Sequence, residues 1–154
     1  MDIMGYLDRA ADLERKISTA YDKTLALTDD PDAKKILRKI SGEEINHANS
    51  LKTGKNYVAQ APDLFLGAKI EEDELDRGAR ELDDFHARFQ GKVGFVSALR
   101  GLLEIEKKLE RVHIGASVVT SDRQLKQLFQ ALTRGDHNHI DALKQIIAGI
   151  EGGA

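Results

Sequence analysis

Six acidic and histidine residues recur in the sequence at matching intervals: a lone Glu, an acidic residue 30 positions later, and a His three positions after that. The two sets are Glu14, Glu44 and His47, and Glu106, Asp136 and His139. Residues at i and i+3 share one face of a helix, so each acidic-x-x-His pair would present an oxygen and a nitrogen ligand together. These residue types at this spacing indicate a metal site.

The six residues interrupt apolar stripes that have helical spacing, which places them on inward-facing surfaces of helices. Glu14, for example, falls between Ala10 and Ile17. A buried, unpaired carboxylate costs several kcal/mol, and four that face one another also repel. Such carboxylates are either protonated or paired with cations, and because no Lys or Arg shares these stripes, we expect metal cations as their partners. Two divalent ions would balance four carboxylates, and a sulfur-free set with two imidazoles suits iron or manganese.

Apolar positions spaced by three and four residues predict the long amphipathic helices that would position these side chains. Four helices are expected, over residues 3–28, 31–54, 93–119 and 122–150. Asp29 or Asp30, followed by Pro31, would begin the second helix. Ser121 with Gln124 has the pattern of a capping box for the fourth. Because the turns are short, the first and second helices, and the third and fourth, should be antiparallel neighbours.

The segment 55–92 would connect the two hairpins, and apolar residues at helical spacing predict a shorter fifth helix near residues 70–89. Two hairpins joined by one long crossover is the layout of ferritin-like bundles. We therefore predict an all-α fold in one domain, residues 1–154. It would be a ferritin-like four-helix bundle of two antiparallel helical hairpins, joined by a long crossover that carries the extra helix.

The two hairpins look like a duplication. A shift of 92 residues places residues 14–52 on residues 106–144 without a gap, and nine of the 39 pairs are identical. Chance at average composition would give about two or three. A site between the halves would then be built twice from equivalent residues. The repeat also pairs Tyr21 with His113, which either hydrogen-bond the ligands as a second layer or are ordinary core residues.

Three further polar residues near the stripes are assigned no role in the site. Helical geometry turns Glu43 outward and turns His137 away from the inward face towards the surface. His86 lies beside Phe85 on the expected crossover helix, where a core or interface histidine is the simpler interpretation.

The segments LERKISTAYD, GEEINHANSL, LLEIEKKLERVH and GDHNHIDALK resemble rubrerythrin, within the ferritin-like di-iron and di-manganese carboxylate proteins. The resemblance covers both hairpins and leaves residues 55–92 unmatched. Asp136 stands where the family has a Glu that bridges the metals, and Leu109 stands where rubrerythrins often have a further carboxylate. The resemblance implies that two iron ions, or manganese, are held by Glu14, Glu44, His47, Glu106, Asp136 and His139.

The same resemblance implies an oxidoreductase whose di-iron centre reacts with peroxide or dioxygen. Since no Cys-rich rubredoxin module accompanies the bundle, electrons would come from an external donor protein. Two alternatives remain open: ferrous iron oxidation or storage in a ferritin-like assembly, and a non-enzymatic helical bundle with a vestigial site. We expect no haem, and the absence of Cys excludes Cys-ligated iron–sulfur clusters.

Composition narrows the remaining classes of function. A chain of 154 residues with 41% hydrophobic and 32% charged residues suits one soluble domain. A net charge of −3 gives no general attraction to nucleic acid or anionic lipid. No apolar segment is long enough to span a bilayer, and the N-terminus lacks a signal peptide, so we expect a cytoplasmic protein. The long crossover would permit exchange of hairpins between chains, and we expect a homodimer.

Overall fold

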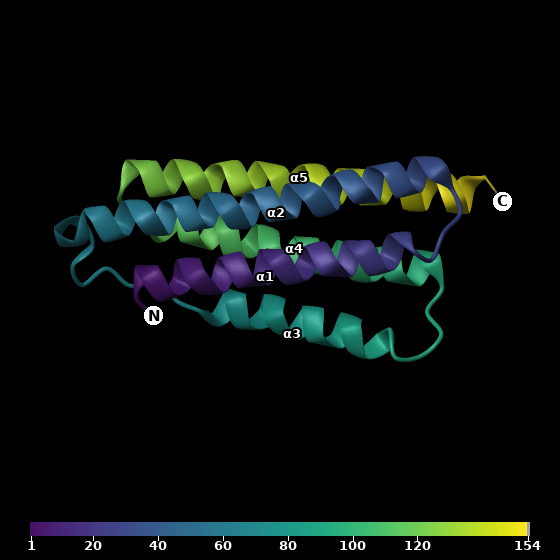
Figure 1. Cartoon of the computed structure of the whole chain (residues 1–154), viewed down its shortest axis with the longest axis horizontal. Coiled ribbons are helices and arrows are strands. Elements are labelled where there is room, and N and C mark those ends of the chain that lie inside the picture. Colours follow the sequence, from purple (N-terminus) through teal and green to yellow (C-terminus); the bar gives the residue numbers. More distant parts are fainter. Residues whose placement is uncertain (154) are drawn as a thin grey trace.

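The computed structural model describes residues 1–153 as a bundle of five α-helices and one short 3₁₀ helix, η1. Figure 1 shows four long helices running along the molecule, with the shorter α3 beside them. The elements are α1 (Ile3–Leu25), α2 (Pro31–Gln60), η1 (Pro62–Phe65), α3 (Asp73–Arg88), α4 (Phe95–Val119) and α5 (Arg123–Gly152). The predicted all-helical bundle is therefore confirmed for the part of the chain that the structure describes.

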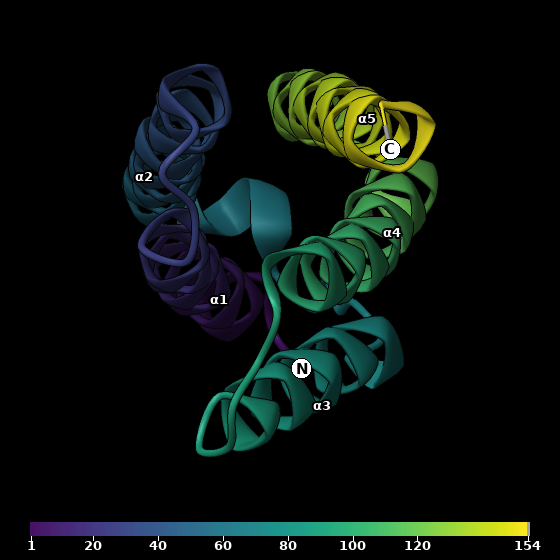
Figure 2. The same cartoon turned by 90° about the vertical axis from the view of Figure 1, so that its right-hand side faces the viewer.

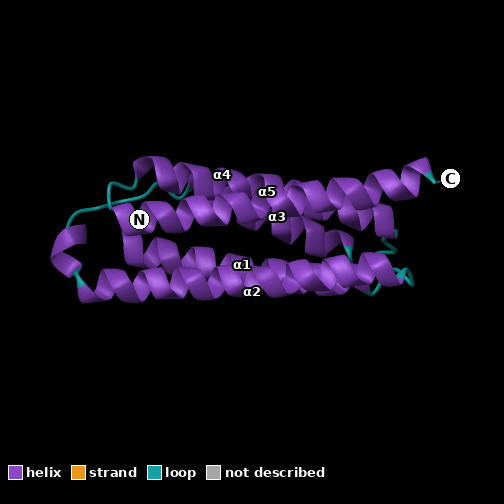
Figure 3. Cartoon of the chain, turned by 90° about the horizontal axis from the view of Figure 1, so that it is seen from above, coloured by secondary structure: helices purple, strands orange, loops and turns teal. Residues whose placement is uncertain are grey.

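The long helices form two hairpins, α1 with α2 and α4 with α5, which lie beside each other in the end-on view (Figure 2). The connections gather at the two ends of the bundle (Figure 3). On the outside, α3 packs against α4 and α1, and its Leu82 and Phe85 are buried there. Within residues 1–153, no helix combines the length and the apolar character needed to cross a membrane.

Aspartates begin three of the long helices, as N-cap chemistry favours. Asp2 accepts a hydrogen bond from the Gly5 amide at 2.7 Å, and Asp30 accepts one from the Asp32 amide. The capping box predicted at Ser121 is wrong, because α5 is capped by Asp122, which accepts from the Leu125 amide at 3.0 Å. A carboxylate there also interacts favourably with the positive end of the helix dipole.

Several predicted boundaries need correction. The crossover helix α3 covers Asp73–Arg88 instead of residues 70–89, α4 begins at Phe95 instead of residue 93, and α5 covers Arg123–Gly152 instead of residues 122–150. The first helix ends at Leu25 instead of residue 28, and α2 continues to Gln60 instead of ending at residue 54. The connection between the hairpins therefore spans residues 61–94, with α3 inside it, instead of residues 55–92. Gly54 does not stop α2, and a Cβ atom at this position would lie 2.8 Å from Leu128 Cδ2 of α5. The glycine allows close approach of two helices.

The line along which α2 lies beside α5, here called the α2/α5 seam, is the side of the bundle opposite α3 (Figure 2). Pockets open at both of its ends. One is lined by Gly54, Tyr57 and Leu128, and the other by Ile36 and Ile146 among others. No helix of the described chain covers this seam, whereas α3 covers the opposite seam between α1 and α4.

Candidate metal centre

The structure brings all six predicted residues together at the middle of the bundle. Each long helix contributes, because the polar interruptions of the apolar stripes fall at the same level. The four carboxylate side chains are fully buried, the His139 side chain is 2% exposed, and the His47 side chain is 14% exposed. The cluster consists of Glu14 from α1, Glu44 and His47 from α2, Glu106 from α4, and Asp136 and His139 from α5.

Two groups of three side chains share Glu44. In the first, His47 Nδ1 lies 3.1 Å from Glu44 Oε2 and 3.8 Å from Glu14 Oε2. In the second, His139 Nδ1 lies 3.0 Å from Glu44 Oε1 and 3.4 Å from Glu106 Oε1. Within each group, one atom from every residue lies within 4.8 Å of the others, as a single bound ion requires. Because Glu44 turns one oxygen to each histidine, two ions would be adjacent.

A third group contains a histidine expected only as a neighbour of the ligands. His113 is fully buried, its Nδ1 lies 2.5 Å from Asp136 Oδ2, and its Nε2 lies 3.2 Å from Glu14 Oε1. Asp136 thus pairs with His113, whereas Glu44, its equivalent in the repeat, contacts both ligand histidines. The Asp side chain is shorter by one bond, about 1.5 Å. Atoms of Glu14, His113 and Asp136 also converge closely enough to hold an ion.

Tyr21, the repeat equivalent of His113, has a different partner. Its hydroxyl donates a hydrogen bond to Glu106 Oε1 at 2.5 Å, inside the bundle. Both residues therefore contact the candidate ligands, which answers the question that the sequence left open about them. The two halves of the duplication hold their carboxylates with different chemistry, a phenol on one side and an imidazole on the other.

Burial and mutual repulsion shift the pKa values of the acidic residues in the cluster. Burial, together with the negative charge of Glu44, raises the pKa of Glu106 to about 8. Burial also raises the pKa of Asp136 to about 6, against the opposing effect of His113. Glu14 behaves differently: burial favours the neutral acid, but the nearby imidazoles of His113 and His47 favour the carboxylate and lower the pKa of Glu14.

The three histidines of the cluster carry the compensating charge. Burial alone would lower their pKa values, but the surrounding carboxylates outweigh it. The pKa rises to about 10 for His47 and His113 and to about 12 for His139. From the sequence, protonated carboxylates, Lys, Arg and metal ions were weighed as solutions to the buried charge, and histidine is a further one that was omitted. In the metal-free protein, imidazolium groups neutralise part of the acidic cluster.

Several buried atoms of the cluster nevertheless have no hydrogen-bond partner. His139 Nδ1 and Glu44 Oε1 lie 3.0 Å apart, yet neither makes a hydrogen bond. Such atoms are rare in folded proteins, and each calls for an explanation. A cation would satisfy them, and the set of oxygens and imidazole nitrogens without sulfur fits iron or manganese. The atoms are Glu14 Oε1 and Oε2, Glu44 Oε1, Glu106 Oε2, Asp136 Oδ1, His113 Nε2 and His139 Nδ1.

Sequence reasoning missed Glu43. It was expected to turn outward, but its carboxylate lies across the α2/α5 seam, with Oε2 at 2.8 Å from His139 Nε2. The interpretation failed because it treated α2 alone, without the neighbouring helix that the flank of α2 faces. The signal that could have found it is chemical: the second ring nitrogen of a metal-binding His usually donates to a carboxylate or carbonyl.

The remaining two histidines lie outside the cluster. His137 is exposed, as expected, with its ring near Glu110 and Asp141. His86 of α3 faces α1, where its Nδ1 lies 3.1 Å from Lys23 Nζ, and its ring contacts Phe85 edge to face. Burial and the Lys23 charge lower the pKa of His86. Neither residue takes part in the candidate centre.

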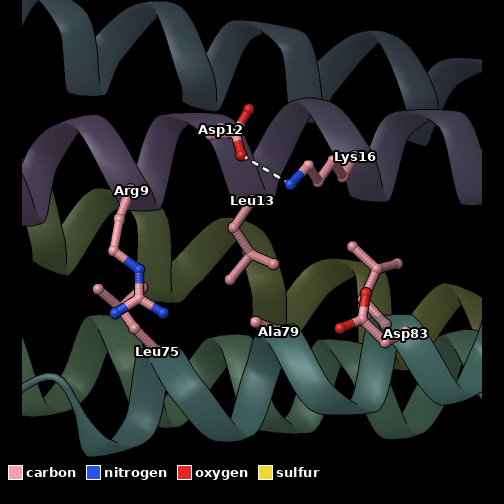
Figure 4. A pocket seen from close by; sticks show the side chains of 8 residues that line it. Arg9, Asp12, Leu13, Lys16, Leu75, Ala79 and Asp83 are labelled. Atoms are coloured by element: carbon pink, nitrogen blue, oxygen red, sulfur yellow. Dashed lines mark ion pairs between the residues drawn. The ribbon is translucent and has the colours of Figure 1, made fainter.

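A pocket between α1 and α3 also lies outside the cluster (Figure 4). Leu13 and Ala79 form part of its wall, and an ion pair joins Asp12 to Lys16 at 2.9 Å beside it. Its lining comes from the outer side of α1 and from α3, and it includes none of the six predicted residues. We assign no chemistry to it.

The Tyr21–Glu106 hydrogen bond yields a first prediction. Tyr21→Phe should destabilise the metal-free protein by about 1–3 kcal/mol, because it leaves a buried carboxyl oxygen unpaired. The melting temperature should fall by roughly 2–4 °C for each kcal/mol. Tyr57→Phe is the matched control, since Tyr57 also donates to a carboxylate, Asp122, but at the end of the bundle. Equal losses of unfolding free energy in the two variants, measured by urea unfolding, would contradict a special role for Tyr21.

Comparison of the chain with protein-family models, curated proteins and solved structures finds no match. The case for a metal centre therefore comes from the side chains of this chain and their contacts.

Proposed function

We propose that this protein is a ferritin-like, rubrerythrin-like di-metal carboxylate protein with redox activity toward peroxide or dioxygen. Iron is the proposed metal, with manganese as the other candidate, and the electrons come from an external donor. One observation carries the proposal: two acidic and histidine groups share Glu44 at the centre of the bundle, with several of their buried oxygen and nitrogen atoms unpaired. The oxygen-rich, sulfur-free ligand set favours iron and manganese over zinc and copper.

The proposed ligand roles correspond to the two groups of side chains that share Glu44. Glu14, Glu44 and His47 would hold one ion, and Glu44, Glu106 and His139 would hold the other. Bound iron would supply redox chemistry at this position, with peroxide or dioxygen as the oxidant and the external donor as the reductant. Tyr21 fixes the orientation of Glu106 through its hydrogen bond.

Asp136 and His113 have a separate part in the proposal. His113 holds the shorter Asp136 next to Glu14, and so places an ionisable imidazole among the carboxylates. That imidazole can keep or give up a proton as the charge on the cluster changes. It occupies the position where the other half of the repeat has Tyr21, whose phenol stays protonated because burial and Glu106 raise its pKa.

Burial of the cluster limits what it can react with. The carboxylates are fully covered, and the only cluster side chain exposed by more than a few per cent is His47, at the α2/α5 seam. A small oxidant such as peroxide or dioxygen needs less space beside the centre than a larger substrate, which would have to separate helices. This supports small-molecule redox chemistry over the modification of a bulky substrate.

A second candidate function has one observation in its favour. Imidazolium groups on His47, His113 and His139 can neutralise most of the carboxylate charge without any metal. The cluster would then be the polar core of a non-enzymatic helical bundle. Metal binding and this alternative differ in whether the protein retains ions after loading and dialysis.

The test combines metal analysis with turnover. Protein loaded anaerobically with ferrous iron and freed of excess metal should retain two ions per chain. It should then oxidise a reduced artificial electron donor on addition of peroxide, faster than the same concentration of free iron. His137→Ala is the control, because this exposed histidine lies outside the cluster and its loss should change neither value. Protein that retains no iron, or that turns over no faster than free iron, would contradict the proposal.

A further inference from the structure

The two halves of the duplication differ at the residue that precedes each acidic-x-x-His pair. Glu43 precedes Glu44 in the first half, and Gly135 precedes Asp136 in the second. Each position faces the ligand histidine of the opposite hairpin across the α2/α5 seam. Glu43 Oε2 lies 2.8 Å from His139 Nε2, whereas a Cβ atom at position 135 would lie 2.6 Å from His47 Nε2.

Glu43 fixes the ring of His139. A carboxylate that accepts from Nε2 keeps a proton on that nitrogen, so Nδ1, on the opposite side of the ring, is the nitrogen that would give up its proton to bind an ion. That side faces Glu44 and Glu106, with Nδ1 at 3.0 and 3.4 Å from their oxygens. The anionic partner also makes the imidazole a stronger ligand. The His139 ring is thus held in a ligand orientation before any ion arrives.

His47 has no such partner. Its Nδ1 faces Glu44 and Glu14, but its Nε2 makes no hydrogen bond with any described residue. The ring lies against the backbone of Gly135 and stacks on the His139 ring with centroids 5.4 Å apart. Its exposed fraction is 14%, compared with 2% for His139. Gly135 therefore makes room for His47 without holding it.

We infer that the centre binds its two ions unequally, with Glu43 positioning His139 at the tighter site and Gly135 leaving His47 at a weaker, more exchangeable site beside the α2/α5 seam. This inference rests on the proposed metal binding. It assigns Glu43 as a positioning residue, since the carboxylate acts through His139 and not on the ion. It also identifies the His47 side as the one from which an ion enters or leaves.

The first test removes the carboxylate. Manganous ion titrated into the metal-free, full-length protein, with free ion followed by electron paramagnetic resonance, should show two binding steps at least tenfold apart. Glu43→Ala should weaken the tighter step by about 10–100-fold and leave the weaker step unchanged. Glu43→Gln should recover part of the loss, because the amide oxygen still accepts from Nε2. Glu104→Ala is the control, since Glu104 is an exposed carboxylate that pairs only with Lys107.

The second test uses the glycine. Gly135→Ala should displace the His47 ring and abolish the weaker step while the tighter step persists. Gly42→Ala, at the position next to Glu43, has no atom within 4 Å of the added methyl and should bind like the parent protein. Alanine favours a helix over glycine, so both variants should stay folded, which circular dichroism will check.

The outcomes separate this inference from the proposed function. Wild-type protein that binds no manganous ion would overturn both. Two binding steps of equal affinity in the wild-type protein would overturn only the inference that the two sites differ in affinity. A Glu43→Ala variant in which both steps weaken equally would overturn the same inference. Retention of both steps in Gly135→Ala would show that the glycine does not set the position of His47.

Discussion

Glu44→Ala should reduce the metal retained by the loaded protein from two ions per chain to fewer than one. Glu44 is the only residue common to the two groups, with one oxygen 3.1 Å from His47 Nδ1 and the other 3.0 Å from His139 Nδ1. Its loss removes a ligand from both ions and one of four negative charges from the cluster. Iron per chain, measured by elemental analysis after anaerobic loading and dialysis, checks the result.

Two comparisons sharpen this prediction. Glu106→Ala, which affects only the group that contains His139, should retain about one ion, because Glu14, Glu44 and His47 remain. Glu104→Ala should retain two, since its side chain lies outside the cluster. Glu44→Ala protein that holds as much iron as the parent would contradict the assignment of Glu44 as the shared ligand.

The metal-free protein should become less stable as pH rises from about 7 to about 9, while the metal-loaded protein should not. The pKa values of His47 and His113 rise to about 10 in the folded protein, so the folded chain holds protons that the unfolded chain has lost above its ordinary histidine pKa of about 6.5. Stability falls with pH wherever the folded state binds more protons. This contribution is complete below about 6.5 and disappears through about 10.

Glu106 adds to the same trend at lower pH. Its pKa rises to about 8, so its contribution is complete below its ordinary value of about 4.5 and is lost as pH rises through 8. Each excess proton held by the fold lowers stability by about 1.4 kcal/mol per pH unit. For one such proton, melting should fall by roughly 5–10 °C between pH 7 and 9.

Metal loading should reverse this dependence because the ligand histidines must be deprotonated to bind an ion. The difference in melting temperature between loaded and metal-free protein should therefore widen as pH rises. Scans of both forms at constant ionic strength measure it. A metal-free melting temperature that stays constant or rises from pH 7 to 9 would show that the histidines of the cluster do not hold excess protons.

Most of the helical architecture follows from the sequence, because long helices with regular apolar stripes carry a strong periodic signal. The boundaries were harder to predict, since they depend on contacts between helices. Gly54 is compatible with the end of a helix in isolation, but it lies within α2, which continues to Gln60, at a point where Leu128 of α5 packs closely against it. Ser121 and Asp122 are both acceptable caps, and the structure uses Asp122.

The six residues of the cluster were predictable for a related reason. Helical spacing places each of them on the inward face of its helix, and the duplication places the two sets at the same level along the bundle. The contacts between helices were not, because they depend on the distance and rotation of each helix relative to its neighbours. Glu43 reaches His139 across the seam, and His113 pairs with Asp136 inside the second hairpin. Their roles follow from the packing of helices on one another and not from the stripe of any one helix.

The most direct measurement of the central claim is an anomalous difference map at the iron edge, from a crystal of the iron-loaded protein. We predict two peaks at the middle of the bundle, one among Glu14, Glu44 and His47 and the other among Glu44, Glu106 and His139. A map with no peak at these positions, from crystals that contain iron, would contradict the assignment of this cluster as a di-metal centre.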